Sequence, residues 1–300
     1  MHIPGIIKRA GRYILRGTPV VVQNKVCMPA QVSVLAPNEL LRGRNALIVG
    51  GTRGIGLATA RAFLNAGAAN VIITGRRAET NNEACKALAA ADGCAGRVHS
   101  MVLDYTDTDA LALVPQRCEE LLQGGKLDIL VNNGGVSGKP IQIADEECWN
   151  TVMNANLRGV YFLSRAVAMY MKERQIKGNI LNVASSSCAY PAPAPYYVSK
   201  WGIRAITPGL AKVFIPYGIV VNCLVPGPTA TDMLHKTADD LSAPGVPAGR
   251  LTTPEEMAAI ALMLVSPMGR CIVGDCVFAT GGCGVITVDD GQHAGAYIIK

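Results

Sequence analysis

Tyr196 and Lys200 stand four residues apart in YYVSK, a spacing with direct chemical use. The residues that follow, WGIRAITPGLAKVF, predict a helix, and side chains four apart lie on one helix face. A lysine ammonium beside a phenol stabilises the phenolate and makes the tyrosine a usable proton donor near neutral pH. Such pairs are also common on helix surfaces, and Tyr197 is an alternative to Tyr196. The pair predicts a proton donor to a carbonyl only if other polar groups accompany it.

Three serines, Ser185 to Ser187, directly follow a predicted strand, Asn179–Ala184. In open α/β sheets, ligands bind beyond the carboxyl ends of the strands. A hydroxyl at this place can hydrogen-bond to a substrate oxygen, although serine runs after strands also form ordinary turns. Together with the tyrosine and lysine, the serines indicate a substrate-binding surface.

A glycine-rich segment, GGTRGIG from Gly50 to Gly56, separates a predicted strand, Asn45–Val49, from a helix that begins near Ile55. Glycines allow a tight turn and let a phosphate approach backbone N–H groups at the helix N-terminus, where the helix dipole favours negative charge. Between a strand and a helix, this pattern favours dinucleotide binding over an ordinary turn.

The residues after the second predicted strand, Asn70–Thr74, are Gly75, Arg76 and Arg77. NAD enzymes usually present a carboxylate here to the adenosine ribose, and a carboxylate would repel a 2′-phosphate. A guanidinium instead forms bidentate contacts with phosphate, and Arg53 in the glycine segment supplies a second cation. The sequence therefore predicts NADP(H) rather than NAD(H) as the cofactor.

From Arg44 onward, short β-branched runs alternate with segments of helical apolar spacing. Strict alternation with nearly continuously apolar strands predicts a parallel sheet covered by helices on both faces. We expect a single doubly wound α/β domain over residues 44–284, with a seven-stranded sheet. The strands are expected at Asn45–Val49, Asn70–Thr74, Val98–Leu103, Leu127–Val131, Asn179–Ala184, Ile219–Leu224 and Cys271–Ala279, and the helices are expected to begin near Ile55, Glu79, Asp107, Glu146, Tyr196 and Pro254.

The composition suits such a domain and argues against nucleic acid as a partner. Half of the 300 residues are hydrophobic and 17% are charged, which provides ample material for a core. The net charge of +6 is concentrated in residues 1–43, which hold six basic side chains and one acidic, whereas the rest hold 22 and 21. The body therefore lacks the basic stripe that follows a phosphate backbone.

The cysteines and histidines give no sign of a metal site. Ten cysteines are scattered without a CxxC pair, and four histidines are too few for a metal cage. We interpret the cysteines as small buried residues in a reducing compartment. No apolar run approaches the roughly 20 residues that cross a bilayer, so we expect no integral membrane segment and a cytoplasmic protein.

The two ends of the chain differ from the domain. Residues 1–43 form a basic extension with no acidic residue before Glu39. Three interpretations are open: an organelle-targeting peptide, a membrane-surface segment, or an extension that packs on the domain or on another subunit. We favour the last. Residues 285–300 form a tail that is expected to cap the site of a neighbouring subunit.

Taken in order, the motifs resemble the classical short-chain dehydrogenases/reductases over about residues 44–284. The resemblance rests on the glycine segment, LDYTD, NNGG, NANLRGV, the serine and tyrosine/lysine set, PGPTATDM, GRLTTPEEMA and GDCVFATGG. It implies a Rossmann-type fold and similarity to members such as 3-oxoacyl-[acyl-carrier-protein] reductases. The implied chemistry is hydride transfer between a nicotinamide cofactor and a ketone or secondary alcohol.

The resemblance also implies a role for each matching residue. Tyr196 would be the general acid/base, Lys200 would bind the nicotinamide ribose and favour the phenolate, Ser185 would orient the substrate carbonyl, and Asn156 would hold a water. Ser186 remains an alternative to Ser185, because the following AYPAPAPY is short and proline-rich. The implied cofactor-binding residues are Gly50, Thr52, Arg53, Gly54, Ile55, Gly56, Arg76, Asp104, Asn132, Tyr196, Lys200, Pro226, Gly227, Thr229 and Thr231.

The resemblance leaves the substrate open. The loops 135–143, 188–195 and 232–249 would shape the substrate site, the last of them as a lid. A 3-oxoacyl thioester or a similar small to medium carbonyl is expected, with a sugar or polyol as the alternative. A non-catalytic dinucleotide-binding regulatory protein is an alternative of another class, although it would not need all four implied catalytic residues. The family also implies a homotetramer or homodimer.

Overall fold

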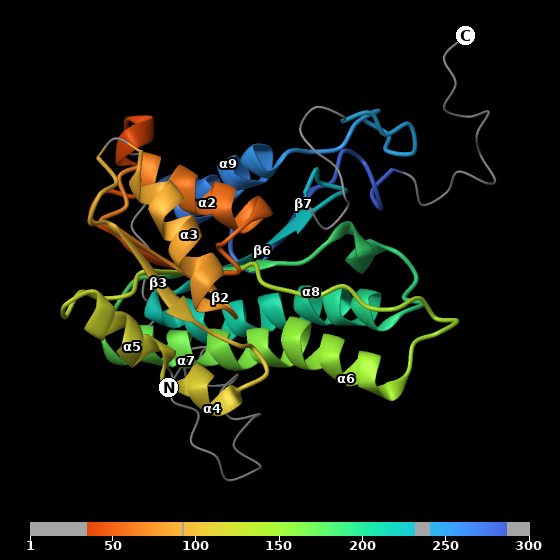
Figure 1. Ribbon diagram of the computed structural model, residues 1–300, viewed down its shortest axis with the longest axis horizontal. Helices are drawn as coiled ribbons and strands as arrows, with labels where there is room; N and C mark the ends of the chain where they lie inside the picture. Colours follow the sequence, from red (N-terminus) through yellow and green to blue (C-terminus); the bar gives the residue numbers. More distant parts are fainter. Residues whose placement is uncertain (1–34, 92, 232–240, 287–300) are drawn as a thin grey trace, which may run out of the picture.

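The computed structural model describes residues 35–91, 93–231 and 241–286. Its centre is a seven-stranded parallel sheet in the order β3-β2-β1-β4-β5-β6-β7 (Figure 1). The predicted doubly wound α/β fold is therefore confirmed. The strands are β1 (Asn45–Val49), β2 (Asn70–Gly75), β3 (Val98–Val102), β4 (Ile129–Asn132), β5 (Asn179–Val183), β6 (Val220–Pro226) and β7 (Cys276–Ala279).

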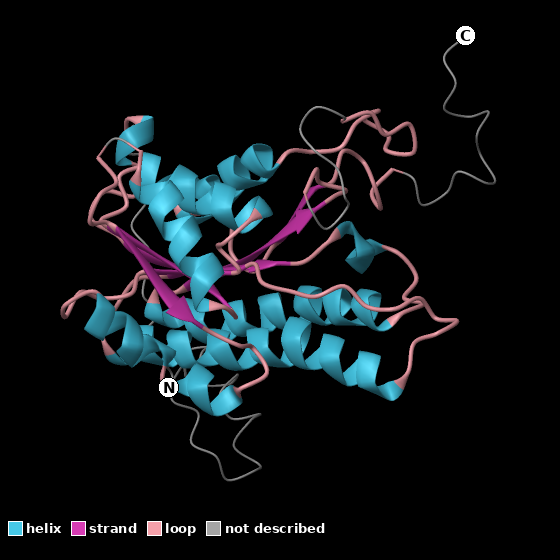
Figure 2. Cartoon of the chain, in the orientation of Figure 1, coloured by secondary structure: helices cyan, strands magenta, loops and turns pink. Residues whose placement is uncertain are grey.

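Helices cover both faces of the sheet, as parallel strands require, and Figure 2 shows the strands between the two helical layers. One layer contains α2 (Gly54–Asn65), α3 (Ala78–Ala89) and α9 (Pro254–Val265). The other contains α4 (Thr108–Ala112), α5 (Val114–Leu121), α6 (Glu146–Met153), α7 (Gly159–Glu173) and α8 (Pro195–Phe214). Short 3-10 turns occur at Pro37–Glu39, Ser186–Ala189, Ile215–Tyr217 and Pro267–Gly269.

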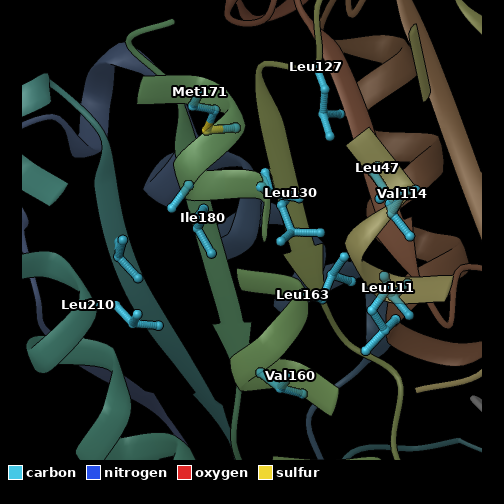
Figure 3. Packing of buried hydrophobic residues seen from close by; sticks show 14 of the residues in the cluster. Leu47, Leu111, Val114, Leu127, Leu130, Val160, Leu163, Met171, Ile180 and Leu210 are labelled. Carbon is cyan, nitrogen blue, oxygen red and sulfur yellow. The ribbon is translucent and has the colours of Figure 1, made fainter. Parts of the chain in front are cut away.

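Two apolar cores, one on each face, hold the layers together. Successive side chains of a strand point to opposite faces, so Leu47 of β1 joins the core below α4, α7 and α8, while Ile48 joins the core below α2 and α9. Figure 3 shows the first core, where Leu130 and Ile180 of neighbouring strands pack with Leu163 of α7. Burial on both faces explains why these strands are apolar at nearly every position.

The strand order places a cleft at the carboxyl ends of β1 and β4. The chain runs from β1 outward to β3, then returns to β4 on the other side of β1 and continues to β7. Connections on opposite sides of the sheet diverge at this switch point, which is where ligands bind in open α/β sheets. The glycine segment follows β1 at this point.

The structure corrects two details of the prediction. Strand β7 begins at Cys276 rather than Cys271, because residues 271–275 turn through Gly274, whose φ is 74°. Leu41, near the end of the predicted extension 1–43, is completely buried. The helix that begins at Glu146 continues through a π-helical turn, Asn154–Arg158, into α7, which the apolar spacing did not indicate.

The remaining predictions about the ends of the chain lie mostly outside the described residues, which exclude 1–34, 232–240 and 287–300. In the described part, no helix is both long and apolar enough to span a membrane. The nine described cysteines are free thiols. The described part of the chain contains no cluster of three or more side chains suited to a metal ion.

Helix α9 begins with a capping box whose loss should be measurable. Thr253 accepts a hydrogen bond from the Glu256 backbone, and the Glu256 carboxylate accepts one from the Thr253 N–H at 2.8 Å. Arg250 also holds the pKa of Glu256 at about 2, below its usual value, so the carboxylate is charged at neutral pH. We expect Thr253→Ala to lower the free energy of unfolding by about 1 kcal/mol in urea denaturation. Thr253→Ser keeps the cap and should match the wild type.

Candidate active site

A cavity of about 1410 Å³ lies at the carboxyl ends of the strands. Three predicted residues, Gly56, Asn132 and Asn156, do not line it and lie behind its wall. The remaining predicted site residues all contribute to one continuous surface: Gly50, Thr52, Arg53, Gly54, Ile55, Arg76, Asp104, Ser185, Tyr196, Lys200, Pro226, Gly227, Thr229 and Thr231.

The glycine segment forms an open backbone loop at the start of α2. The N–H groups of Gly50 and Gly51 both donate to Thr74 O, at 3.0 and 3.1 Å. Gly50 and Gly54 have φ angles of 71° and 53°, a conformation that favours glycine. A Cβ on Gly56 would lie 2.1 Å from Gly50 O, so only glycine lets α2 pack this closely under the loop.

This loop fits a phosphate group. The N-cap residue of α2, Arg53, makes no capping hydrogen bond with its side chain, and the first N–H groups of a helix have no partner within the helix. The start of α2, Gly54 and Ile55, lines the cavity. The helix dipole adds partial positive charge at the same place. A dinucleotide bound here would be held by Gly50, Gly54 and Ile55 at its phosphates.

Three exposed arginines, Arg53, Arg76 and Arg77, line the cavity. Arg53 belongs to the glycine loop, and Arg76 follows β2 directly. Gly75 before Arg76 has no room for a side chain, since a Cβ would lie 2.5 Å from Asn81 Oδ1. The site predicted for an acidic residue in NAD enzymes is therefore occupied by glycine and arginine.

Tyr196 and Lys200 are both on α8, and both line the cavity. The Lys200 ammonium is buried, donates to Val183 O at 3.2 Å and lies 5.5 Å from the centre of the Tyr196 ring. Ser185 stands at the end of β5, and its Oγ accepts from Ser187 N at 3.2 Å. The predicted Tyr/Lys/Ser set thus lines one cavity.

Asn156 lies in the π-helical turn, with its amide fully engaged by protein groups. Its Oδ1 accepts from Val136 N at 2.8 Å, and its Nδ2 donates to Val136 O at 2.8 Å and to Ser199 Oγ at 3.3 Å. Ser199 Oγ in turn donates to Tyr196 O at 2.7 Å. The amide of Asn156 therefore joins the loop after β4 to the turn of α8 that carries Tyr196.

Asn132 is the centre of a buried polar network below the cleft. Its amide accepts from the Tyr105 hydroxyl and donates to Ser164 and Asn182, each at 2.9 Å. Burial raises the pKa of Tyr105 well above its usual value, so the phenol stays protonated and remains a donor. The next residue, Asn133, lines the cavity instead and donates to Gly50 O at 3.0 Å.

The turn after β6 closes the cavity at its other end. Gly227 N donates to Ala279 O at 3.0 Å, and Thr229 Oγ1 donates to Gly227 O at 2.9 Å. A Cβ on Gly54 would lie 3.2 Å from Thr231 Cγ2, so this turn reaches the glycine loop. Residues 232–240, half of the predicted lid 232–249, lie outside the described residues.

Several cavity residues were not predicted as site residues. Lys139, Tyr190 and Thr151 line the cavity, as does Tyr197, which the sequence offered only as the alternative to Tyr196. Lys139 pairs with Asp145 at 2.7 Å. The signal for Lys139 and Tyr190 was their place in the predicted loops 135–143 and 188–195, whereas Thr151 lies on α6, where the helical spacing gave no such indication.

Comparisons with known proteins place the chain in a family. A family model described as short chain dehydrogenase matches residues 44–242. The chain is 33% identical over 250 residues to gluconate 5-dehydrogenase of Gluconobacter oxydans, covering 81% of this chain and 95% of that protein. It is also 33% identical over 248 residues to a 3-oxoacyl-[acyl-carrier-protein] reductase of Thermotoga maritima, covering 81% and 98%.

Solved structures agree. A gluconate 5-dehydrogenase from Burkholderia cenocepacia, in complex with NADP and tartrate, superposes with a TM-score of 0.72 at 30% identity, covering 82% of this chain and 98% of the other. These similarities confirm the family resemblance and extend over nearly the whole predicted domain. The chain is an oxidoreductase of the short-chain dehydrogenase family.

Proposed function

We propose that the protein uses NADP(H) to interconvert a ketone and a secondary alcohol, with Tyr196 as the general acid/base. The observation that carries the proposal is the meeting of Tyr196, Lys200 and Ser185 in the same cavity as the glycine loop. NADPH, when bound, supplies the hydride for reduction, and NADP⁺ accepts it in the reverse direction.

The side chains divide the remaining chemistry. In the reductive direction, the Tyr196 hydroxyl donates its proton to the carbonyl oxygen while the carbonyl carbon gains the hydride. The Lys200 ammonium, 5.5 Å from the ring, stabilises the phenolate that this leaves behind. The Ser185 hydroxyl hydrogen-bonds to the same carbonyl oxygen, and Asn156, through Ser199, holds the turn of α8 that carries Tyr196. The net change is one hydride and one proton added across the C=O bond.

The cofactor contacts follow the cavity from end to end. The glycine loop, Gly50 to Ile55, would hold the phosphates, Asp104 would meet the adenine, and Gly227 with Thr231 would hold the nicotinamide end. Arg53 and Arg76 support the choice of the 2′-phosphorylated cofactor, because guanidinium groups bind phosphate and no carboxylate follows β2 directly. A solved relative contains NADP, in agreement with this choice.

The cofactor choice can be tested at Arg76. We expect Arg76→Ala to weaken NADPH binding by about 10- to 100-fold, because one charge-assisted phosphate contact is lost, and to leave NADH binding unchanged. Isothermal titration calorimetry of both nucleotides measures this. Arg61→Ala removes an exposed arginine of α2 outside the cavity and serves as the control. Tighter NADH than NADPH binding by the wild type would contradict the cofactor assignment.

The substrate is proposed to be a 3-oxoacyl thioester or a similar small to medium carbonyl. A sugar or polyol is the second candidate, favoured by the hydroxyl groups of Ser137, Ser187, Tyr190 and Tyr197, which line the same cavity. Loss of NADPH absorbance with 3-oxoacyl thioesters and with keto-sugars or keto-acids distinguishes the two candidates. Nucleotide binding without turnover on any ketone or alcohol would instead favour a regulatory protein.

We further propose that residues 44–284 form the catalytic domain, that 1–43 and 285–300 are appendages, and that the protein is a homotetramer or homodimer in the cytoplasm. The exposed Trp149, Tyr161 and Phe162 on α6 and α7 support self-association. Light scattering after size-exclusion chromatography tests the oligomer.

Localisation of a fluorescent fusion, with and without residues 1–40, tests organelle targeting by the basic extension.

A further inference from the structure

The substrate side of the cavity has a wall with little regular structure. The segment from Ser185 to Tyr190 connects β5 to the loop before α8, and Ser185, Ser186, Ser187 and Tyr190 all line the cavity. Its regular structure is one short 3-10 turn, Ser186–Ala189. The position of this wall must therefore depend on contacts with neighbouring elements.

Two side chains of α8 make those contacts. Arg204 Nη1 donates to Cys188 O at 2.9 Å, and Trp201 Nε1 donates to Tyr190 O at 2.7 Å. The two residues are three apart on the helix and adjacent on its surface. Both hydrogen bonds hold backbone carbonyls of the wall, while neither side chain lines the cavity.

The arginine is itself fixed by aromatic rings. Its guanidinium carbon lies 5.0 Å from the centre of the Trp201 ring and 5.4 Å from that of Phe278 on β7. A guanidinium stacked on aromatic faces keeps its in-plane N–H groups available for hydrogen bonds. The wall also meets the C-terminal end of the domain, where the Tyr190 side chain hydrogen-bonds to Cys283. We call Trp201 and Arg204 the α8 clamp.

We propose that the two residues of the α8 clamp are positioning residues for the carbonyl substrate. They hold the Ser185–Tyr190 wall at a fixed position relative to Tyr196. This inference rests on the proposed function. Helix α8 carries both Tyr196 and the clamp, so one rigid element fixes the proton donor and the substrate wall together. The part of the cavity proposed to bind the phosphates, which includes Gly50 and Arg76, is formed by other elements. The clamp therefore affects the carbonyl substrate and spares the nucleotide.

The test uses Arg204→Gln and the milder Trp201→Phe, which keeps a ring and removes the N–H donor. In the full-length protein, each variant is expected to raise KM for the best carbonyl substrate about tenfold, with a smaller change in kcat. The dissociation constant of NADPH is expected to stay within about twofold of the wild type. Amide hydrogen exchange should become faster in peptides covering residues 186–194. Arg204→Lys keeps the charge and loses the planar guanidinium, so its KM should lie between those of the wild type and Arg204→Gln.

A matched control changes an arginine elsewhere. Arg61→Gln on α2 alters an exposed side chain that does not line the cavity, and this variant should behave like the wild type. Unchanged KM and unchanged exchange in both clamp variants would overturn the inference. A parallel loss of NADPH affinity would also overturn it, because the clamp would then support the whole domain. Absence of turnover by the wild type on every carbonyl and alcohol would instead remove the proposed function, and the substrate role with it.

Discussion

Tyr196→Phe is expected to lower kcat for carbonyl reduction by about 10²- to 10⁴-fold, the usual contribution of a positioned general acid. The substitution removes only the hydroxyl that would donate the proton. The ring stays between Lys200, 5.5 Å away, and Tyr197, whose ring centre lies at 6.3 Å in an edge-to-face arrangement. We therefore expect unchanged stability and unchanged NADPH affinity, measured by thermal unfolding and calorimetry beside steady-state kinetics.

The neighbouring tyrosine provides the decisive comparison. Tyr197 also lines the cavity and was the alternative to Tyr196 from the sequence. The lysine on the same helix lies beside Tyr196, which makes Tyr196 the group whose phenolate a cation stabilises. Collapse of turnover in Tyr197→Phe with a nearly normal Tyr196→Phe would reverse the assignment. Tyr217→Phe, which removes a phenol that does not line the cavity, controls for the loss of a phenol as such.

Gly56→Ala is expected to weaken NADPH binding by about 10- to 100-fold and to lower the free energy of unfolding by about 1–3 kcal/mol, a usual cost of overpacking. A Cβ at this position would lie 2.1 Å from Gly50 O and 2.6 Å from Asn133 Nδ2. The backbone oxygen cannot move unless the glycine loop moves with it. The loop would then no longer present its N–H groups at the N-terminus of α2 to a phosphate. Calorimetry with NADPH and urea denaturation measure the two effects.

Gly209→Ala is the matched control, because it makes the same chemical change on α8 with nothing within 4 Å of the new Cβ. A glycine inside a helix is less stable than alanine by about 0.5–1 kcal/mol, so this variant should gain stability. Its NADPH affinity should equal that of the wild type. Normal NADPH affinity in a folded Gly56→Ala protein would show that the glycine loop is not the phosphate site.

Local sequence patterns were sufficient for the alternating architecture. Strand β1 matches its predicted range, Asn45–Val49, and α6 begins at the predicted Glu146, because apolar runs and helical spacing are properties of neighbouring residues. The position of Tyr196 and Lys200 on one face of a helix followed in the same way from the helical repeat. The glycine segment was recognisable because it stands between a strand and a helix.

Contacts between distant residues decided what the patterns left open. Whether Asn132 or Asn133 faces the cavity depends on where β4 ends and on the partners that Tyr105, Ser164 and Asn182 bring to Asn132. The amide of Asn156 is bound by a backbone 20 residues away.

The sequence by itself thus determined the family, the layered sheet and most of the residues that surround the cavity, since these follow from short-range periodicity and ordered motifs. Only the tertiary structure decided which polar side chains reach the cavity and which support it from behind. It also brought Phe278 onto Arg204, across 74 residues of chain. The physical reason is that a side chain's hydrogen bonds and burial depend on groups that the fold, and not the neighbouring sequence, places beside it.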